Sequence, residues 1–315
     1  MHFLKSSFLT ILFFVITFNI NEKYSAQVLF DVSLKDYTTF RVGGNAAVFL
    51  SPSDLQSLTS LMDLAKKSND KIFVLGGGSN VVVPDEGFDG IVISTLKLNK
   101  ISLTEEGLVC ECGASMHDIL DFCIEHSLTG LEKFAGLPGT CGGAAFMNAR
   151  CYEKSISDVL LAVKYYADGK IIDYKMDKAD WSYKKSPFQG DLNNDSKPLV
   201  LSVTFDVRKG DKSEIAGQAE KYIRDREEKG HFRFPSAGSV FKNNHDFGKP
   251  SGKIIDECGL RGLTSGGAQI APWHGNFIIN KDNASASDIR KLVEEVKKTV
   301  REKTGFELEC EIIFL

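Results

Sequence analysis

The pattern of apolar and polar positions along the chain predicts an alternation of helices and strands. One group of apolar residues recurs at the three- and four-residue spacing of a helix: Leu55, Leu58, Leu61, Met62 and Ala65. A polar, turn-forming stretch precedes this group. We therefore expect a helix here, with Ser51 or Ser53 as its N-cap.

Three further segments have the same helical character. Residues 115–130 form an amphipathic pattern that Gly130 is expected to close, because glycine readily adopts the left-handed conformation at a helix end. Residues 211–230 form a highly charged helix, and residues 285–305 form the last helix of the chain. A domain boundary is expected near residues 209–212, at the start of the charged helix.

Short apolar runs between these helices predict strands. They lie at residues 71–75, 81–83, 90–94, 101–104, 108–112 and 198–207. Asp168–Gly169 separates two further runs and indicates a hairpin turn. The final strand is expected over residues 306–315, where alternation puts Glu307, Glu309 and Glu311 on one face. The pattern as a whole predicts a mixed α and β protein.

Composition narrows the class of protein without identifying it. The 315 residues are 43% hydrophobic and 25% charged, with a net charge of −4 and no long basic run. This balance argues against nucleic acid as the main partner, because phosphate binding needs clustered lysine and arginine. The seven cysteines form no C-x-x-C pair, so we expect reduced thiols and no metal site.

The N-terminus contains a possible leader. Lys5 precedes the apolar run of residues 8–18, and small residues follow it. This order resembles a secretory signal, and the run is short for a membrane span. Alternatively, residues up to about 27 lie outside the working protein, which then starts near Val28.

Glycine is abundant, with 28 residues, and three clusters of it lie in the first half of the chain. They are "YTTFRVGGNA" at 37–46, "LGGGSNVVV" at 75–83 and "GLPGTCGGAAFMNA" at 136–149. Each could be a plain tight turn. Together they favour backbone N–H groups that converge on one extended, phosphate-bearing ligand, although neither the nicotinamide-type nor the P-loop glycine motif is present.

A serine follows a tight turn of small residues in "FPSAGSVFKN", residues 234–243. No G-x-S-x-G motif surrounds Ser239, and no nearby histidine–aspartate pair accompanies it in the sequence. A nucleophilic role is therefore disfavoured. The residues alone leave a helix cap or some other role as alternatives.

Eight motifs occur in one order: TTFRVGG, LGGGSN, GLPGTCGG, YKKSPF, PSAGSVFKN, SGKIIDECGLRG, GGAQI and GNFIIN. Their combination resembles the UDP-N-acetylenolpyruvoylglucosamine reductase (MurB) family, from about Leu34 to the C-terminus. The resemblance implies an α+β protein with the FAD-binding fold of the vanillyl-alcohol oxidase (PCMH) type. Its two subdomains would span residues 28–210, and a substrate-binding domain would span residues 211–315.

The resemblance also implies the residues that line FAD. They are Arg41, Gly43, Gly44, Gly76, Gly77, Gly78, Ser79, Asn80, Gly136, Pro138, Gly139, Thr140 and Gly143. Some relatives tether the flavin through a histidine that follows the equivalent of Gly44. Asn45 stands there in this chain, so we expect FAD to be bound without a covalent link.

The implied reaction is the NADPH-dependent reduction of UDP-N-acetylglucosamine enolpyruvate to UDP-N-acetylmuramate, in peptidoglycan precursor synthesis. Ser239 would give a proton to carbon as the general acid. Glu311 matches the glutamate of the family, although alternation alone does not separate it from Glu307 and Glu309. Lys184 stands where the family has arginine; it keeps the charge but lacks the planar fork.

The substrate-contacting positions of the family match Tyr183, Lys229, Asn243 and His274, where other members carry glutamine in place of the histidine. The family's basic residue in the last strand is Ile313 here. The segment between Phe188 and Ser239 has room for one strand and one helix. It therefore resembles the shorter subtype, which lacks the insertion that clamps the substrate.

Two other functions stay open at this stage. One is an oxidase of the same flavin fold, and the other is a flavin-binding protein without turnover, which the changes at Lys184 and Ile313 would favour. The substrate and NADPH are cytosolic molecules and the cysteines suit a reducing compartment. We therefore expect a cytoplasmic protein with no stable membrane insertion, despite the apolar leader.

Overall fold

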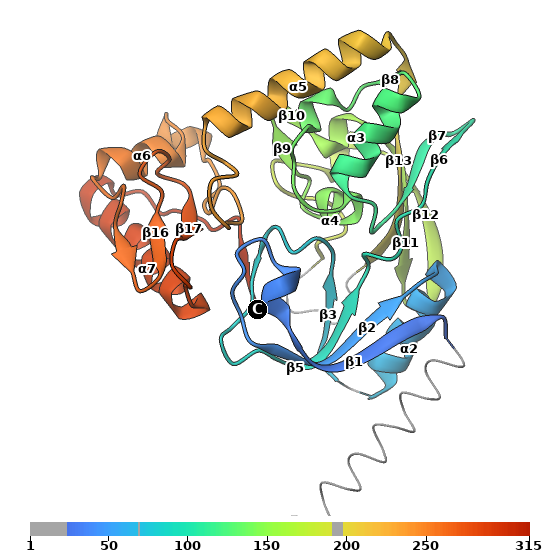
Figure 1. Ribbon diagram of the computed structural model, residues 1–315, viewed down its shortest axis with the longest axis horizontal. Coiled ribbons are helices and arrows are strands. Elements are labelled where there is room, and N and C mark those ends of the chain that lie inside the picture. The colour runs from blue at the N-terminus through green and yellow to red at the C-terminus, as the bar shows by residue number, and fades with distance from the viewer. Residues whose placement is uncertain (1–23, 69, 191–197) are drawn as a thin grey trace, which may run out of the picture.

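The computed structural model describes residues 24–68, 70–190 and 198–315. Figure 1 shows a sheet from the N-terminal part in blue and cyan, a second sheet with helices in green and yellow, and a C-terminal lobe in orange and red. Residues 1–23 of the expected leader lie outside the described residues. The first strand begins at Ala26, two residues before the expected start of the folded part.

The first sheet has the strand order β1-β2-β5-β3. β1 and β2 are antiparallel, whereas β5 runs parallel to both β2 and β3. The elements are β1 Ala26–Ser33, β2 Asn45–Pro52, α2 Leu55–Ser68, β3 Ile72–Leu75, β4 Val81–Val82 and β5 Phe88–Ser94. The expected serine cap of α2 is wrong: the Asp54 carboxylate accepts from the Ser57 N–H at 2.7 Å.

The second sheet is antiparallel throughout, with the order β12-β11-β13-β7-β6. Its strands are β6 Ile101–Thr104, β7 Gly107–Glu111, β11 Leu160–Ala167, β12 Lys170–Lys175 and β13 Leu199–Phe205. Asp168 and Gly169 both have positive φ, of 49° and 76°. This is the backbone of a tight two-residue hairpin, so the expected turn is confirmed.

Helices α3 Met116–Glu125, α4 Cys141–Phe146 and α5 Lys212–Glu228 accompany the second sheet. Two expectations are corrected here. α3 ends before Gly130, because Ser127 turns left-handed with a φ of 57° and Leu128–Thr129 (β8) then pairs with Arg208–Lys209 (β14). The glycine cluster at 136–149 contains α4, whose N-cap Thr140 accepts from the Gly143 N–H at 3.3 Å.

The C-terminal lobe contains a three-stranded antiparallel sheet, β15-β16-β17, and two helices. Its elements are α6 Ser251–Glu257, β15 Thr264–Ser265, β16 Ala268–Ile270, β17 Ile278–Asn280 and α7 Ala286–Thr304. One apolar face of α7, with Ile289, Leu292 and Val296, is buried in the core of the lobe. The remaining short elements are β9 Arg150–Cys151, β10 Lys154–Ser155 and the 3-10 helices η1 Leu34–Tyr37, η2 Glu132–Phe134, η3 Ile156–Asp158, η4 Lys178–Asp180 and η5 His245–Phe247.

The segment after α7 is not the continuous strand that alternation predicts. Only Ile313–Phe314 (β18) is a regular strand, and it pairs in parallel with β4. Earlier in the segment, Cys310 forms an isolated antiparallel bridge with Phe241. The segment therefore divides its backbone partners between the lobe that contains Phe241 and the loop that follows β3.

α5 connects the second sheet region to the C-terminal lobe (Figure 1). Ala219 of this helix packs with Leu120 of α3 and with Ala135. The expected division near residue 210 stays a prediction. None of the helices within the described ranges is long and apolar enough to cross a membrane.

Asp85 joins the N-terminal part to the C-terminal lobe. Its two carboxylate oxygens accept from the backbone N–H groups of Ala286 and Ser287, at 2.7 and 2.9 Å, in the first turn of α7. Burial opposes the charge on Asp85, but these hydrogen bonds outweigh it and hold its pKa below the usual value. Asp85 thus supplements the capping box that Ser285 and Asp288 form at the same helix end.

We predict that Asp85→Ala lowers the free energy of unfolding at pH 7 by about 1 kcal/mol, the usual cost of a lost helix cap. The folded-state pKa of Asp85 is depressed, so its contribution is present above the unfolded-state pKa and disappears as the pH falls through the lower folded-state value. Urea unfolding at pH 7 and pH 3 should therefore show a difference from the parent that shrinks at pH 3. Asp89→Ala, at an exposed aspartate of β5, is the control; an equal loss in both variants would contradict the capping role.

Candidate active site

A large cleft lies where the three parts of the molecule meet. Its volume is about 3000 Å³, and its walls come from the β3–β4 loop, residues 136–144, the end of α5, residues 231–239 and the C-terminal segment. A typical small-molecule pocket holds about 300–1000 Å³. The cleft therefore has room for an extended ligand, or for two ligands side by side.

Two glycine-rich loops pack backbone against backbone in the cleft wall. A Cβ atom on Gly77 would lie 2.6 Å from the Gly139 Cα, and one on Gly76 would lie 2.7 Å from the Thr140 Oγ1. No larger side chain fits between these loops. The main chain itself, rather than side chains, therefore forms this part of the surface.

The cleft also contains a buried cation. Arg226 is 7% exposed, and its Nε donates to the Ala135 carbonyl at 2.8 Å. Within the described residues, its buried Nη2 has no hydrogen-bond partner. Main-chain loops and a guanidinium with an unpaired Nη2, in a cleft of this size, fit a dinucleotide such as FAD, whose phosphates need N–H and cationic donors.

The expected cofactor residues do not all lie at the cleft. Those that line it are Arg41, Gly76, Gly77, Gly78, Ser79, Asn80, Gly136, Pro138, Thr140 and Gly143. Gly43 and Gly44 pack instead against the segment after β4, where added Cβ atoms would lie 2.5 Å from the Val83 Cβ and 2.4 Å from the Asp85 carbonyl. Gly139 packs against Gly77, and a Cβ atom added to it would lie 2.5 Å from the Ser79 Oγ.

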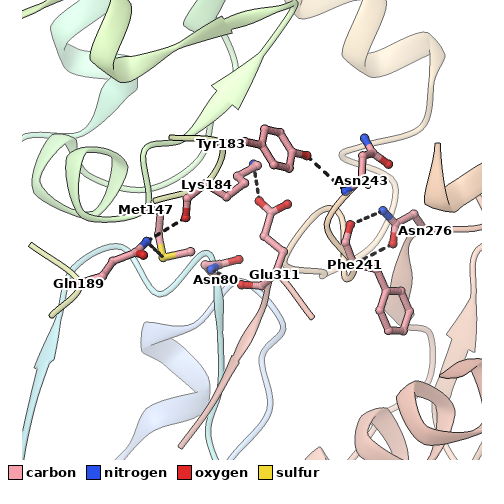
Figure 2. A network of polar contacts seen from close by, with 9 residues as sticks. All are labelled: Asn80, Met147, Tyr183, Lys184, Gln189, Phe241, Asn243, Asn276 and Glu311. Carbon is pink, nitrogen blue, oxygen red and sulfur yellow. Dashed lines mark hydrogen bonds and ion pairs between the residues drawn. The ribbon is translucent and has the colours of Figure 1, made fainter. Parts of the chain in front are cut away.

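Lys184 and Glu311 meet in the cleft wall although they are 127 positions apart in the sequence. The Lys184 ammonium forms an ion pair with the Glu311 Oε1, as Figure 2 shows. Both side chains are largely buried, with 10% and 14% exposed. A charged pair withdrawn from water in this way has a stronger local field than a surface pair.

The structure separates the three glutamates that alternation left equivalent. The side chains of Glu307 and Glu309 are 72% and 71% exposed and face Arg301 and Lys242. Glu311 alone of the three is withdrawn from solvent. Its carbonyl accepts from the Asn80 Nδ2 at 3.0 Å, and its N–H donates to the Val240 carbonyl at 2.7 Å.

Ser239 lines the same cleft as the glycine-rich loops. Gly238 before it has a φ of 72°, and Ser239 itself forms an isolated bridge with Phe277. Asn276 fixes the next residues by exchanging two hydrogen bonds of 2.8 Å with the Phe241 backbone. The structure shows no partner for the Ser239 hydroxyl among the described residues. Ser239 begins no helix, so a helix-cap role is excluded.

Three of the four expected substrate-contacting residues lie at the cleft. Asn243, Lys229 and His274 line it directly. The Tyr183 hydroxyl accepts from the Asn243 N–H at 3.3 Å, which Figure 2 shows, but the Tyr183 ring faces a smaller neighbouring pocket. Lys229 forms an ion pair with Asp225 at 2.6 Å.

Two histidines lie side by side near the end of α5. The rings of His231 and His274 are 6.1 Å apart, and both contact Phe277. Burial, followed by the charges of Arg226, His274 and Lys229, lowers the pKa of His231 to about 4. Burial likewise lowers the pKa of His274. Both imidazoles are therefore neutral near pH 7, in a strongly cationic neighbourhood.

Sequence reasoning missed several residues of this site. Helical periodicity could have found Arg226, because it shares the buried face of α5 with Ile215 and Ala219. No periodicity of this kind points to Tyr152 or Gln189. The Tyr152 hydroxyl donates to the Asp225 carboxylate at 2.8 Å. The partners of these two residues are distant in sequence or belong to the main chain.

Comparison with known proteins agrees with this geometry. Residues 46–175 match the sequence model of the FAD binding domain, and residues 230–315 match that of the UDP-N-acetylenolpyruvoylglucosamine reductase C-terminal domain. The UDP-N-acetylenolpyruvoylglucosamine reductase of Treponema denticola is 48% identical over 294 residues, covering 89% of this chain and 91% of the relative. That of Borreliella burgdorferi is 42% identical, covering 90% and 93%.

A solved structure gives the same result. The crystal structure of UDP-N-acetylenolpyruvylglucosamine reductase (MurB) from Thermus caldophilus superposes with a TM-score of 0.76 at 31% identity, covering 92% of this chain and 99% of that one. The expected flavin-binding fold is therefore confirmed. With relatives this similar over nine-tenths of its length, the chain belongs to the UDP-N-acetylenolpyruvoylglucosamine reductase family.

Proposed function

We propose that Ser239, Lys184 and Glu311 carry out the chemistry of this chain, an FAD- and NADPH-dependent reductase of UDP-N-acetylglucosamine enolpyruvate. The observation that carries the proposal is the buried ion pair of Lys184 and Glu311, which shares the cleft with the Ser239 hydroxyl. FAD, held by the glycine-rich loops and Arg226, would supply hydride from NADPH to the outer carbon of the enolpyruvyl group.

Ser239 acts as the general acid. Hydride addition to the outer carbon leaves enolate charge on the neighbouring carbon, which must then gain a proton. The backbone of Ser239 is fixed by a tight turn and by the bridge to Phe277. The hydroxyl donates to no other described residue, so its proton is available for the carbon, and the resulting alkoxide is reprotonated from solvent.

Lys184 stabilises the negative charge that develops on the substrate. The ammonium is already oriented by Glu311, so little reorganisation is needed when charge develops. Lysine contacts a carboxylate as a point charge, whereas an arginine would form two parallel hydrogen bonds. The site therefore depends on the position of the Lys184 Nζ atom rather than on the planar geometry of a guanidinium group.

The remaining polar residues of the cleft bind the substrate. Lys229 provides a cation and Asn243 and His274 provide neutral hydrogen-bonding groups, with Tyr183 packed behind Asn243. His274 accepts from the Asn276 N–H through its Nδ1 at 3.2 Å. The proton of the neutral ring is therefore on Nε2, where it can donate as an amide group would.

The rival functions are disfavoured. The family assignment favours the reductase over an oxidase of the same fold. Lys184 keeps the positive charge of the arginine that it replaces and meets Glu311, so this substitution gives no support to a protein without turnover.

The substrate and the reductant of the proposed reaction are cytosolic, and this supports a cytoplasmic location for the enzyme. The short segment between Phe188 and Ser239 supports the shorter subtype of the family.

We predict that the purified protein contains FAD that heat or acid releases intact. Asn45, at the position where a tethering histidine would stand, donates to the Asp31 carboxylate at 2.8 Å and is exposed on β2. Absorbance of the filtrate after denaturation measures release. Flavin that stays on the denatured chain would contradict non-covalent binding, and a colourless protein that cannot be reconstituted would contradict the flavoenzyme itself.

We predict that Lys184→Arg keeps most of the activity and that Lys184→Ala loses it severely, because the site needs a cation beside Glu311. Steady-state NADPH oxidation with the enolpyruvyl substrate measures both variants. Lys185→Ala, at the exposed neighbouring lysine, is the matched control and should behave like the parent. If Lys184→Ala matched the parent, the required cation would have to be Lys185 or Arg233 instead.

We predict that Ser239→Ala separates the two halves of the reaction. NADPH should still bleach the flavin at nearly the parental rate, because that step needs no proton from the serine. Reoxidation by the enolpyruvyl substrate should slow about 10²- to 10⁴-fold, the usual effect of losing a positioned general acid. Substrate affinity should change far less.

Stopped-flow absorbance of the two half-reactions tests this prediction, with Ser236→Ala in the same turn as the control. Equal slowing of both halves would mean that Ser239 only shapes the turn. Parental rates in both halves would remove it from the mechanism.

A further inference from the structure

The backbone of Lys184 adopts a conformation that lysine rarely takes. Its φ is 57°, in the left-handed region that normally favours glycine or asparagine. Tyr183 and Lys184 are the central residues of a tight turn, whose ends Ser182 and Lys185 exchange backbone hydrogen bonds of 3.3 and 3.0 Å. An unfavourable conformation of this kind persists only where neighbouring groups enforce it.

A side-chain amide holds this turn from the cleft side. The Nε2 of Gln189 donates to the Lys184 carbonyl at 3.1 Å and also lies 4.0 Å from the Met147 sulfur. Figure 2 shows the Gln189 amide beneath the Lys184 carbonyl, with the Lys184 ammonium directed toward Glu311. Within the described ranges, Gln189 is the donor to this carbonyl. At the other end of the turn, Asn148 donates to the Ser182 carbonyl at 2.8 Å.

We propose that Gln189 is a positioning residue for the reaction: it fixes the Lys184 carbonyl, and with it the left-handed turn that directs the ammonium to Glu311. The inference rests on the proposed role of Lys184. Without the amide donor, the peptide after Lys184 can rotate toward the more common right-handed or extended conformation. The ammonium then leaves its place beside Glu311 although the lysine is still present.

Other contacts anchor this region independently of Gln189. The Phe188 side chain is 2% exposed and packs edge-on against Trp181 and Tyr174. The Ser186 hydroxyl donates to the Phe146 carbonyl at 2.6 Å. Loss of the Gln189 amide should therefore leave the fold and the cofactor site intact, and its effect should be confined to Lys184.

The test is a double-mutant cycle between Gln189→Met and Lys184→Ala. Methionine keeps the length of the side chain but cannot donate to a carbonyl. Gln189→Met should lower kcat about 3- to 10-fold, the rate equivalent of one hydrogen bond, with unchanged FAD content and Tm. In the Lys184→Ala background the same change should have almost no further effect, because the cation that it positions is gone.

Gln218→Met, at an exposed glutamine of α5, is the matched control and should match the parent in both backgrounds. If Gln189→Met proves unstable, Gln189→Glu takes its place, because an ionised carboxylate also cannot donate to the carbonyl. An equal fractional loss of kcat in both backgrounds, or no loss in either, would overturn the inference. A parent protein that does not oxidise NADPH with the enolpyruvyl substrate would instead overturn the proposed function.

Discussion

The pairing of the C-terminal segment with the end of the glycine-rich loop is the contact on which the active site depends. β18 lies parallel to β4. Asn80 contacts the chain on both sides of Ile312: its side-chain amide donates to the Glu311 carbonyl, and its backbone carbonyl accepts from the Ile313 N–H. This arrangement places Glu311 between the loop expected to hold the cofactor and the lobe that carries Ser239. Without it, Lys184 would face solvent rather than a carboxylate.

Carboxamide side chains recur around the three candidate catalytic residues, and each acts on main-chain atoms. Asn80 holds the strand of Glu311, Asn276 holds the backbone that follows Ser239, and Gln189 holds the turn of Lys184. An amide can donate and accept at once without carrying charge. It can therefore fix a neighbouring residue without altering the electrostatic balance of the site.

Much of the fold could be predicted from local pattern, because helices and strands with one buried face repeat with a fixed period. The helices that became α2, α5 and α7 and the hairpin at Asp168–Gly169 are of this kind. Helix ends were less predictable: Ser127, rather than Gly130, turns left-handed because the following residues pair with β14. The prediction of one continuous last strand failed because the backbone partners of that segment lie in two different parts of the molecule.

The site was predictable only in part, for a similar reason. Motif order selected Ser239, Lys184 and Glu311 as candidates, and the structure brings Lys184 and Glu311 together. Alternation could not choose among the three glutamates, because the burial of Glu311 comes from residues far away in the chain. Arg226 had a signal in its helical phase, whereas Gln189 had none, because its partner is a carbonyl that every residue possesses. A hydrogen bond to a main-chain carbonyl cannot be predicted from the type of residue that supplies the carbonyl.

The Asn80–Glu311 hydrogen bond spans 231 positions of sequence, and this has a consequence for the order in which the protein folds. Closing so long a loop costs entropy that only the surrounding structure can offset. The four strands of the first sheet all pair within residues 26–94, so this sheet is expected to form early. The Glu311 carboxylate would then reach its place late, when the C-terminal segment docks onto a cofactor-binding region that is already assembled.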